Sequence, residues 1–238
     1  MAKTEAPRIV VSKDGPYVVT GEVPVSIQVI EPNKEGLSWE WKQGKEFPVN
    51  GKMEYSLCRC GQSKTKPFCD GTHAKIRFNG NETATRKPYV RQAETSDGPT
   101  LTLNDAESLC AFARFCDPGG QIWNLIEQTD DPKARELVIR EANYCPSGRL
   151  VVRDKKTGKT IEHELPPSIG VIEDPALGCS GPLWVRGGIP IESQDGKPYE
   201  VRNRVTLCRC GASSNMPFCN GSHASIKFKD GLEPFTRK

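Results

Sequence analysis

One pattern recurs at a fixed offset in this chain of 238 residues. Residues 57–73 read LCRCGQSKTKPFCDGTH, and residues 207–223 read LCRCGASSNMPFCNGSH, with no gap between the two copies. The likeness extends upstream, where GPYVVTGEVPV at 15–25 resembles GPLWVRGGIPI at 181–191. Each upstream element alternates apolar residues around a glycine turn, which predicts two short strands. Because a unit this small seldom buries a core of its own, we expect the two copies to pack together.

Both copies carry the spacing Cys-x-Cys-x8-Cys-x3-His. Thiolates are soft donors and imidazole is an intermediate one, so this set is suited to a metal. Buried apolar cysteines are common, but eight matched positions argue against that reading here. The third cysteine and the histidine would share one face of a helix beginning near Pro67 or Pro217. The candidate ligands are Cys58, Cys60, Cys69 and His73, with Cys208, Cys210, Cys219 and His223. Spacing alone leaves structural zinc open, because three cysteines and a histidine are also a zinc set.

Composition narrows the class of protein. Hydrophobic residues make up 36% and charged residues 26%, a globular balance, and the net charge of +3 gives no case for a nucleic-acid or membrane partner. Ten cysteines suggest either disulfides or metal ligands. The segment Met1–Asp14 has no apolar core of a secretion signal, which favours metal ligands in a reducing compartment. We therefore expect a cytoplasmic protein, with a bacterial cytoplasm as the best fit.

The motif CRCGQSKTKPFCDGTH resembles the signature of the CDGSH iron–sulfur family, the mitoNEET-like proteins, and CRCGASSNMPFCNGSH is similar to it. The resemblance implies two [2Fe–2S] clusters. In the first, Cys58 and Cys60 would bind one iron, and Cys69 and His73 the other. The second would use Cys208 and Cys210, then Cys219 and His223, in the same way.

The family resemblance also implies a fold. Family members join a small β cap to a cluster-binding helix and loop, in an intertwined dimer. For this chain we expect an α+β fold in which the two repeats form an intramolecular pseudo-dimer, so that the protein is a monomer. The expected domains are a first repeat at 1–90, a ferredoxin-like α/β middle segment at 91–165, and a second repeat at 166–238.

Two residues of the motif bear on its chemistry. A single histidine ligand titrates near neutral pH, so it predicts proton-coupled electron transfer and cluster loss on protonation. It should also raise the reduction potential above that of an all-cysteine site. Asn220 stands where the family usually has an aspartate, so the second site could differ in potential, or the position could simply cap local backbone.

The middle segment holds three further cysteines, Cys110, Cys116 and Cys145, while Cys179 follows later without an identifiable partner. The segment 104–116 predicts a helix, Asp131 caps a second helix through about Asn143, and 150–164 predicts a hairpin. CAFARFC with CPSGRL resembles a divergent single-cluster ferredoxin in which Ala113 replaces one ligand. Three cysteines could hold a three-iron cluster, or a four-iron cluster with an outside ligand, but a relic with buried cysteines is favoured.

No acid/base pair, nucleophile elbow or phosphate-binding loop is present in the sequence, so we expect no enzyme. Basic residues beside the motifs (Arg59, Lys64, Lys66 and Arg209) would complement cluster charge, dock an acidic redox partner, or form a solvated rim. Electron transfer is the favoured function, with a redox protein as partner. The alternatives are a cluster carrier or sensor serving apo-protein acceptors, and a structural zinc module.

Overall fold

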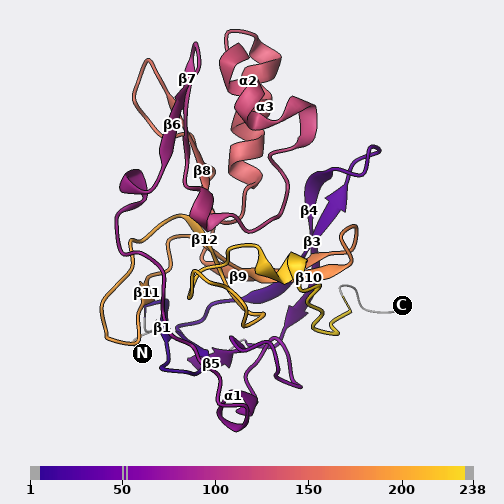
Figure 1. Cartoon of the computed structure of the whole chain (residues 1–238), viewed down its shortest axis with the longest axis vertical. Coiled ribbons are helices and arrows are strands. Elements are labelled where there is room, and N and C mark those ends of the chain that lie inside the picture. Colours follow the sequence, from indigo (N-terminus) through magenta and orange to yellow (C-terminus); the bar gives the residue numbers. More distant parts are fainter. Residues whose placement is uncertain (1–5, 50, 52, 234–238) are drawn as a thin grey trace.

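The computed structural model describes residues 6–49, 51 and 53–233. The outer ends of the predicted first and last domains, 1–5 and 234–238, lie outside these residues. Within the described part, short strands in mixed sheets dominate and helices are few, which confirms the α+β expectation. Figure 1 shows the middle segment at one end of an elongated molecule and the helix of the first repeat at the other.

Three sheets form in the described residues. The first has the order β11-β1-β2-β5, with bounds Ile191–Glu192, Arg8–Val11, Tyr17–Thr20 and Glu54–Leu57. The second has the order β12-β10-β9-β3-β4, with bounds Arg204–Leu207, Cys179–Arg186, Ser168–Asp174, Val25–Pro32 and Ser38–Phe47. The third, in the middle segment, has the order β6-β7-β8, with bounds Glu94–Asp97, Leu101–Asp105 and Leu150–Asp154.

Each repeat contributes a strand to the sheet of the other. β3 leaves the first repeat and runs parallel to β9, with Val25 opposite Ile169. β11 leaves the second repeat and runs parallel to β1, with Ile191 opposite Ile9. A single hydrophobic core draws side chains from both repeats. The two copies therefore pack together, as the repeat predicted.

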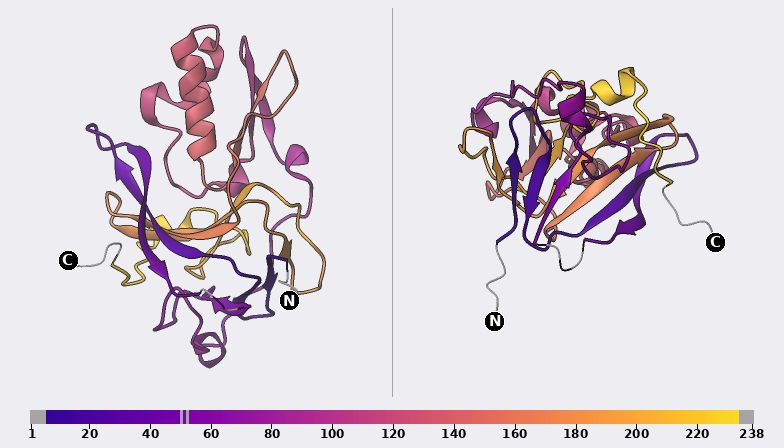
Figure 2. Two further views of the ribbon diagram at one scale, coloured as in Figure 1. Left: turned by 180° about the vertical axis from the view of Figure 1, so that it is seen from behind. Right: turned by 90° about the horizontal axis from the view of Figure 1, so that it is seen from below.

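Between the Gly-Pro that opens each repeat and its first motif cysteine, the first repeat is 16 residues longer than the second, and this insertion forms longer strands. β3 and β4 pair along most of their length, with Val25 opposite Phe47 and Glu31 opposite Glu40. Trp41 on β4 packs against Phe115 and Trp184, and its ring centroid lies 4.7 Å from the ring centroid of each. The longer strands therefore contact the middle segment through Trp41 (Figure 2).

The middle segment partly departs from the prediction. The expected helix at 104–116 is wrong, because its first residues complete β7, which pairs with β8, and the rest is a short 3-10 turn and an irregular loop. The hairpin is reduced to one bridge between Arg153 and Thr160. The second helix, α3 (Pro132–Tyr144), is confirmed, and the Asp131 side chain accepts from the Ala134 amide at 3.1 Å. Apolar side chains of α3, α2 (Ile122–Leu125) and the sheet form a separate core.

The 3-10 turns are η1 (Tyr89–Arg91), η2 (Glu107–Leu109), η3 (Pro118–Gly120) and η4 (Ile126–Gln128).

The helices of the two motifs are shorter than predicted. α1 spans Thr72–Lys75 and α4 spans Ser222–Ser225, so neither begins at the preceding proline. In the first motif the Cys58 amide donates to Pro67 O and the Cys69 amide donates to Ser56 O, both within 3 Å. These bonds hold the loop in extended form against the end of β5. The third cysteine therefore precedes the helix instead of lying on it.

Candidate metal centres

The four candidate ligands of each motif lie in two pairs. In the first motif, Sγ of Cys58 is 3.8 Å from Sγ of Cys60, and Sγ of Cys69 is 3.2 Å from Nδ1 of His73. In the second, the corresponding distances are 3.6 Å for Cys208 with Cys210 and 3.4 Å for Cys219 with His223. The thiol pair comes from the loop after a strand, and the second pair from the residues that open the short helix.

These separations are those of two donors sharing a metal. Tetrahedral bonds of the usual lengths put two sulfurs about 3.8 Å apart, and a sulfur and a nitrogen about 3.6 Å apart. Among the described side chains, no group of three or more His, Cys, Asp or Glu is arranged to hold one ion. The eight ligands are thus arranged as four separate pairs, and this donor set fits a binuclear centre in each motif.

The backbone adds hydrogen bonds to the sulfurs. The Gly71 amide approaches Sγ of Cys69 at 3.4 Å, and the Gly221 amide approaches Sγ of Cys219 at the same distance. Both glycines have φ near +80°, a conformation that L side chains rarely adopt, so a glycine is required there to aim the amide. Amide donors of this kind stabilise thiolates that carry negative charge.

The two thiol loops lie back to back. A Cβ on Gly61 would lie 2.5 Å from Cys210 O, and a Cβ on Gly211 would lie 2.6 Å from Cys60 O. Each loop therefore needs a bare backbone where it meets the other. At this contact the backbones of the two thiol loops touch, so the two candidate centres are neighbours in the structure.

The arginine between the first two cysteines of each motif is buried, which excludes the docking and solvated-rim alternatives for Arg59 and Arg209 and leaves the complement to cluster charge. Arg59 donates through Nε to Gly15 O at 2.8 Å and through Nη2 to Ser12 O at 2.9 Å, while Nη1 has no hydrogen-bond partner. Arg209 donates to Gly181 O in the equivalent way. Because they are buried, these side chains hold neighbouring backbone carbonyls in place and do not offer a surface to a partner protein.

Arg209 also meets two carboxylates. It pairs with Glu173 at 2.7 Å and with Asp230, whose side chain is 1% exposed. The arginine keeps the pKa of Asp230 below its usual range, whereas burial raises the pKa of Glu173 to about 7. Arg59 has no such acid, since Gly80 stands in the first repeat where Asp230 stands in the second. Asp14 lies near but accepts from the Gly80 amide.

Burial opposes free thiolates in the second motif. It raises the pKa of Cys219, and with Arg209 it lowers the pKa of His223 to about 4. Cys208 is the exception, because the Cys210 thiol and backbone amides lower its pKa to about 6. The imidazole is therefore neutral at physiological pH, the form that binds metal, and a buried set of thiolates would need a cation among them.

Sequence reasoning missed Tyr17, Glu173 and Asp230. The Tyr17 hydroxyl donates to Cys208 O at 2.7 Å and Pro217 O at 2.9 Å, so a residue of the first repeat supports the second motif. Tyr17 and Glu173 lie far from the second motif in sequence, and Asp230 follows it without belonging to the repeated pattern, since Gly80 stands at that position in the first repeat.

The cysteines of the middle segment line one small cavity. Cys110, Cys116 and Cys145 share it with Arg149, and burial raises the pKa of Cys116. Their sulfurs contact neighbours instead of one another: Cys116 is 3.8 Å from Asp117 Oδ1, and Cys145 is 3.5 Å from Ser147 Oγ. Cys179 lines a different cavity beside Asp174.

Comparison with protein families gives two results. The profile described as iron-binding zinc finger CDGSH type matches residues 14–74 and 180–224, which contain both motifs. The two repeats are therefore CDGSH-type domains. A second profile, described as a divergent 4Fe-4S mono-cluster, matches residues 96–155 between the two CDGSH repeats. No curated protein and no solved structure shows a significant match.

The middle segment offers fewer thiols than the four that a four-iron cluster usually takes. Three thiols line its cavity, and Ala113 stands at the fourth position.

No helix in the described part of this CDGSH protein is long and apolar enough to cross a membrane.

Proposed function

We propose that this CDGSH protein binds two [2Fe–2S] clusters, each through three cysteines and one histidine, and transfers electrons. The thiol pair of each motif would hold one iron and the cysteine–histidine pair the other. A bound cluster would supply one-electron redox chemistry. The observation that carries the proposal is the division of each ligand set into two pairs at tetrahedral separations.

The chain's own residues provide the setting for such a centre. Backbone amides of Gly71 and Gly221 donate to sulfur, and Arg59 places buried positive charge within the first motif. Both features stabilise a negatively charged centre and raise its electron affinity. No acid/base or nucleophilic constellation accompanies them, so we propose a carrier and not an enzyme.

We also propose that the two repeats form an intramolecular pseudo-dimer. The reciprocal strand exchange, β3 onto β9 and β11 onto β1, supports it, as does the matching contact of Gly61 and Gly211 with the opposite motif. Such an arrangement satisfies within one chain the pairing that a dimer would supply, so the protein would be a monomer. The middle segment would be a ferredoxin-like insert that no longer holds a cluster, and free thiols at all ten cysteines suit a cytoplasmic setting.

Iron and acid-labile sulfide counts on the purified protein test the proposal. We expect two irons and two sulfides per motif, a coloured protein, and an electron paramagnetic resonance signal after reduction. Zinc in place of iron, without sulfide, would support the structural zinc module instead. A surplus of iron over four per chain would show that the middle segment also binds a cluster.

Cluster donation is the second candidate, because Cys69 and His73 are only half-buried. Incubation with an apo-ferredoxin separates the two functions. An electron carrier would reduce or oxidise redox proteins while keeping its iron, whereas a donor would lose iron to the apo-protein at a comparable rate.

A further inference from the structure

The two candidate centres differ in exposure. In the first motif Cys69 and His73 are half-buried, while in the second Cys219 is 2% exposed and His223 is 4% exposed. In Figure 1, α1 lies at the end of the molecule remote from the middle segment, and α4 lies between that segment and the first repeat. The same local motif therefore has two different surroundings.

Other parts of the chain cover the second motif. The amides of Thr83 and Ala84 both donate to Met216 O, and the Thr83 hydroxyl donates to Ser214 O at 2.8 Å. From the middle segment, Ser108 O accepts from the Asn215 amide group at 2.9 Å. The cover also reaches the glycine of the ligand turn: a Cβ on Gly221 would lie 3.3 Å from Cβ of Phe112.

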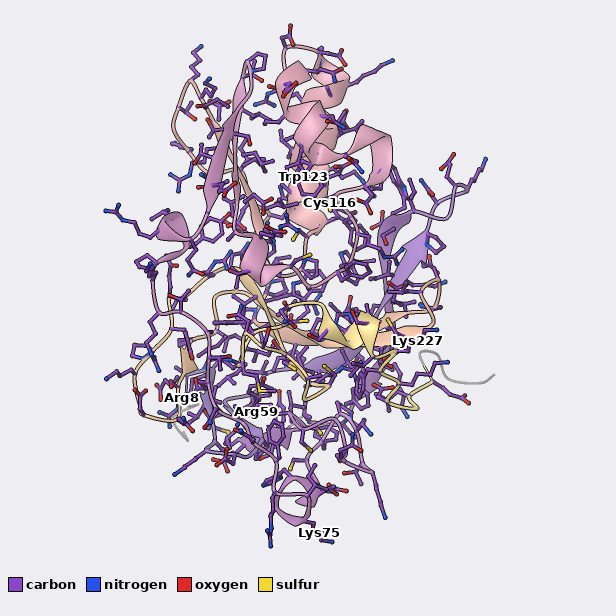
Figure 3. The ribbon with its side chains drawn as sticks, viewed as in Figure 1. Arg8, Arg59, Lys75, Cys116, Trp123 and Lys227 are labelled. Atoms are coloured by element: carbon purple, nitrogen blue, oxygen red, sulfur yellow. The ribbon has the colours of Figure 1, made fainter. Side chains whose placement is uncertain are left out.

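The charges around the two motifs differ as well. The first motif presents the cations Lys64, Lys66, Lys75 and Arg77. At the equivalent positions the second has Ser214, Met216, Ser225 and Lys227. Lys64, Lys75 and Arg77 are exposed and Lys66 is half-buried, and Figure 3 shows Lys75 at the tip of the molecule. We call these four residues of the first motif the basic rim.

One acid lies within the basic rim. Asp70 is exposed, and its carboxylate accepts from the amides of Lys64 and Thr72, both at 2.9 Å. These bonds lower its pKa, so it remains charged and offsets one of the four cations. The rim keeps an excess of positive charge beside an apolar side chain, Ile76, which is 47% exposed. Ile226 is 53% exposed at the second motif, where the neighbouring exposed cations are Lys227 and Lys229.

We infer that the first repeat is the electron port of this protein, and that an acidic electron-transfer protein docks on the basic rim beside Cys69 and His73. The inference rests on the proposed electron-transfer function. In the exchange, one electron would leave the reduced partner, which would be oxidised, and would reduce a cluster held by the first motif. A cluster held by the second motif would exchange electrons with the first across the contact between the thiol loops at Gly61 and Gly211.

Charge complementarity supports this choice of partner. Opposite charge on two surfaces speeds encounter and fixes orientation, and the effect is strongest at low salt. The exposed Ile76 gives the rim an apolar contact of the kind found at the centre of transient interfaces. A partner bound at the second motif would meet fewer cations, and the cysteine–histidine pair there is buried.

The test uses the iron-loaded full-length protein and an acidic plant-type [2Fe–2S] ferredoxin as the probe. A rim variant carries Lys64→Ser, Lys66→Met and Lys75→Ser, the residues that the second motif has at those positions. A control variant loses the same three charges elsewhere, by Lys156→Ser, Lys159→Ser and Lys227→Ser. Affinity is measured by calorimetry with both proteins oxidised, and the rate of reduction by stopped-flow mixing with reduced ferredoxin.

We expect the rim variant to bind ferredoxin at least about tenfold more weakly at low ionic strength, and to be reduced correspondingly more slowly. The control should stay within about twofold of the unmodified protein, and high salt should remove the difference. Equal losses in both variants, or none in the rim variant, would overturn the inference. Because all proteins are first checked for iron and sulfide, this outcome is separate from a failure to bind clusters.

Discussion

Arg59 and Arg209 occupy equivalent positions, but their neighbours leave a different net charge beside each candidate centre. Arg59 is bonded to carbonyl groups, and its guanidinium lies 5.4 Å from the ring centroid of Phe78. Arg209 is neutralised by Glu173 and Asp230. Asp70 lies beside the first motif where Asn220 lies beside the second, but it is exposed and its charge is screened by water. The buried acids that pair with Arg209 therefore lower the potential of the second centre more than the exposed Asp70 lowers that of the first. We expect the first centre to have the higher reduction potential.

This charge difference predicts the effect of Asp230→Asn. Removal of the carboxylate leaves Arg209 less compensated, so the second centre should gain electron affinity, on the order of 1 kcal/mol for a partly buried charge. A redox titration followed by electron paramagnetic resonance should show the lower midpoint rising toward the upper one. Asp195→Asn, at an exposed turn, is the control. If both midpoints move equally, the assignment of the lower one to the second repeat is wrong.

Glu141 predicts a pH dependence of stability. Its side chain is fully buried, neither carboxylate oxygen has a hydrogen-bond partner, and burial raises its pKa to about 8. Because the native state holds the proton and the unfolded state releases it near pH 4.5, the free energy of unfolding falls as pH rises from there to about 8. The loss is at most about 5 kcal/mol.

Glu141→Gln should remove this slope, because glutamine cannot ionise. Urea unfolding between about pH 5 and about pH 8 compares the variant with the unmodified protein. The variant should be the more stable at the alkaline end. An unchanged slope would mean that another group is responsible.

At the scale of elements, the thiol loops are defined by the bonds that hold them. The segment between the second and third cysteines folds back on its own strand, through Cys58 with Pro67 and Cys69 with Ser56. Its equivalent uses Cys208 with Pro217 and Cys219 with Thr206. The helix then begins only at the residue after Gly71 or Gly221, so the cysteine–histidine pair spans a turn and not a helix face.

The loop contact predicts the cost of Gly61→Ala. The new methyl would meet Cys210 O at 2.5 Å and would require a positive φ, so both steric overlap and backbone strain oppose it. We expect a loss of roughly 3 kcal/mol or more in the free energy of unfolding. Gly36→Ala is the matched control, since Gly36 has φ of +81° and nothing within 4 Å. It should cost only the strain, about 1 kcal/mol. Similar losses in both variants would show that the contact does not matter.

At the scale of the whole molecule, strand exchange makes the repeats interdependent. β9 is hydrogen-bonded to β3, and β1 to β11, and one core joins both repeats. The middle segment has a core of its own and meets the repeats through Trp41, Phe115 and Trp184. Unfolding of one repeat would therefore expose the core of the other.

We accordingly expect both repeats to unfold in one cooperative transition. Loss of visible absorbance from the two centres and loss of β-sheet circular dichroism should coincide on heating. A core substitution in the first repeat alone, Val19→Ala, should lower the transition temperature of both centres together. Two separate losses of absorbance would contradict the shared core.

The sequence by itself determined the repeat, the eight candidate ligands, the strands around the glycine turn and the capped helix α3. Each depends on residues close together in the chain, where spacing, periodicity and capping act directly. It failed at 104–116, where local helix signals were overridden by the pairing of β7 with β8. It left open whether Arg59 and Arg209 are internal or exposed, because burial depends on distant parts of the chain. Only the tertiary structure decided that Cys69 and His73 are half-buried while Cys219 and His223 are covered, since the residues that pack on each motif come from distant parts of the chain.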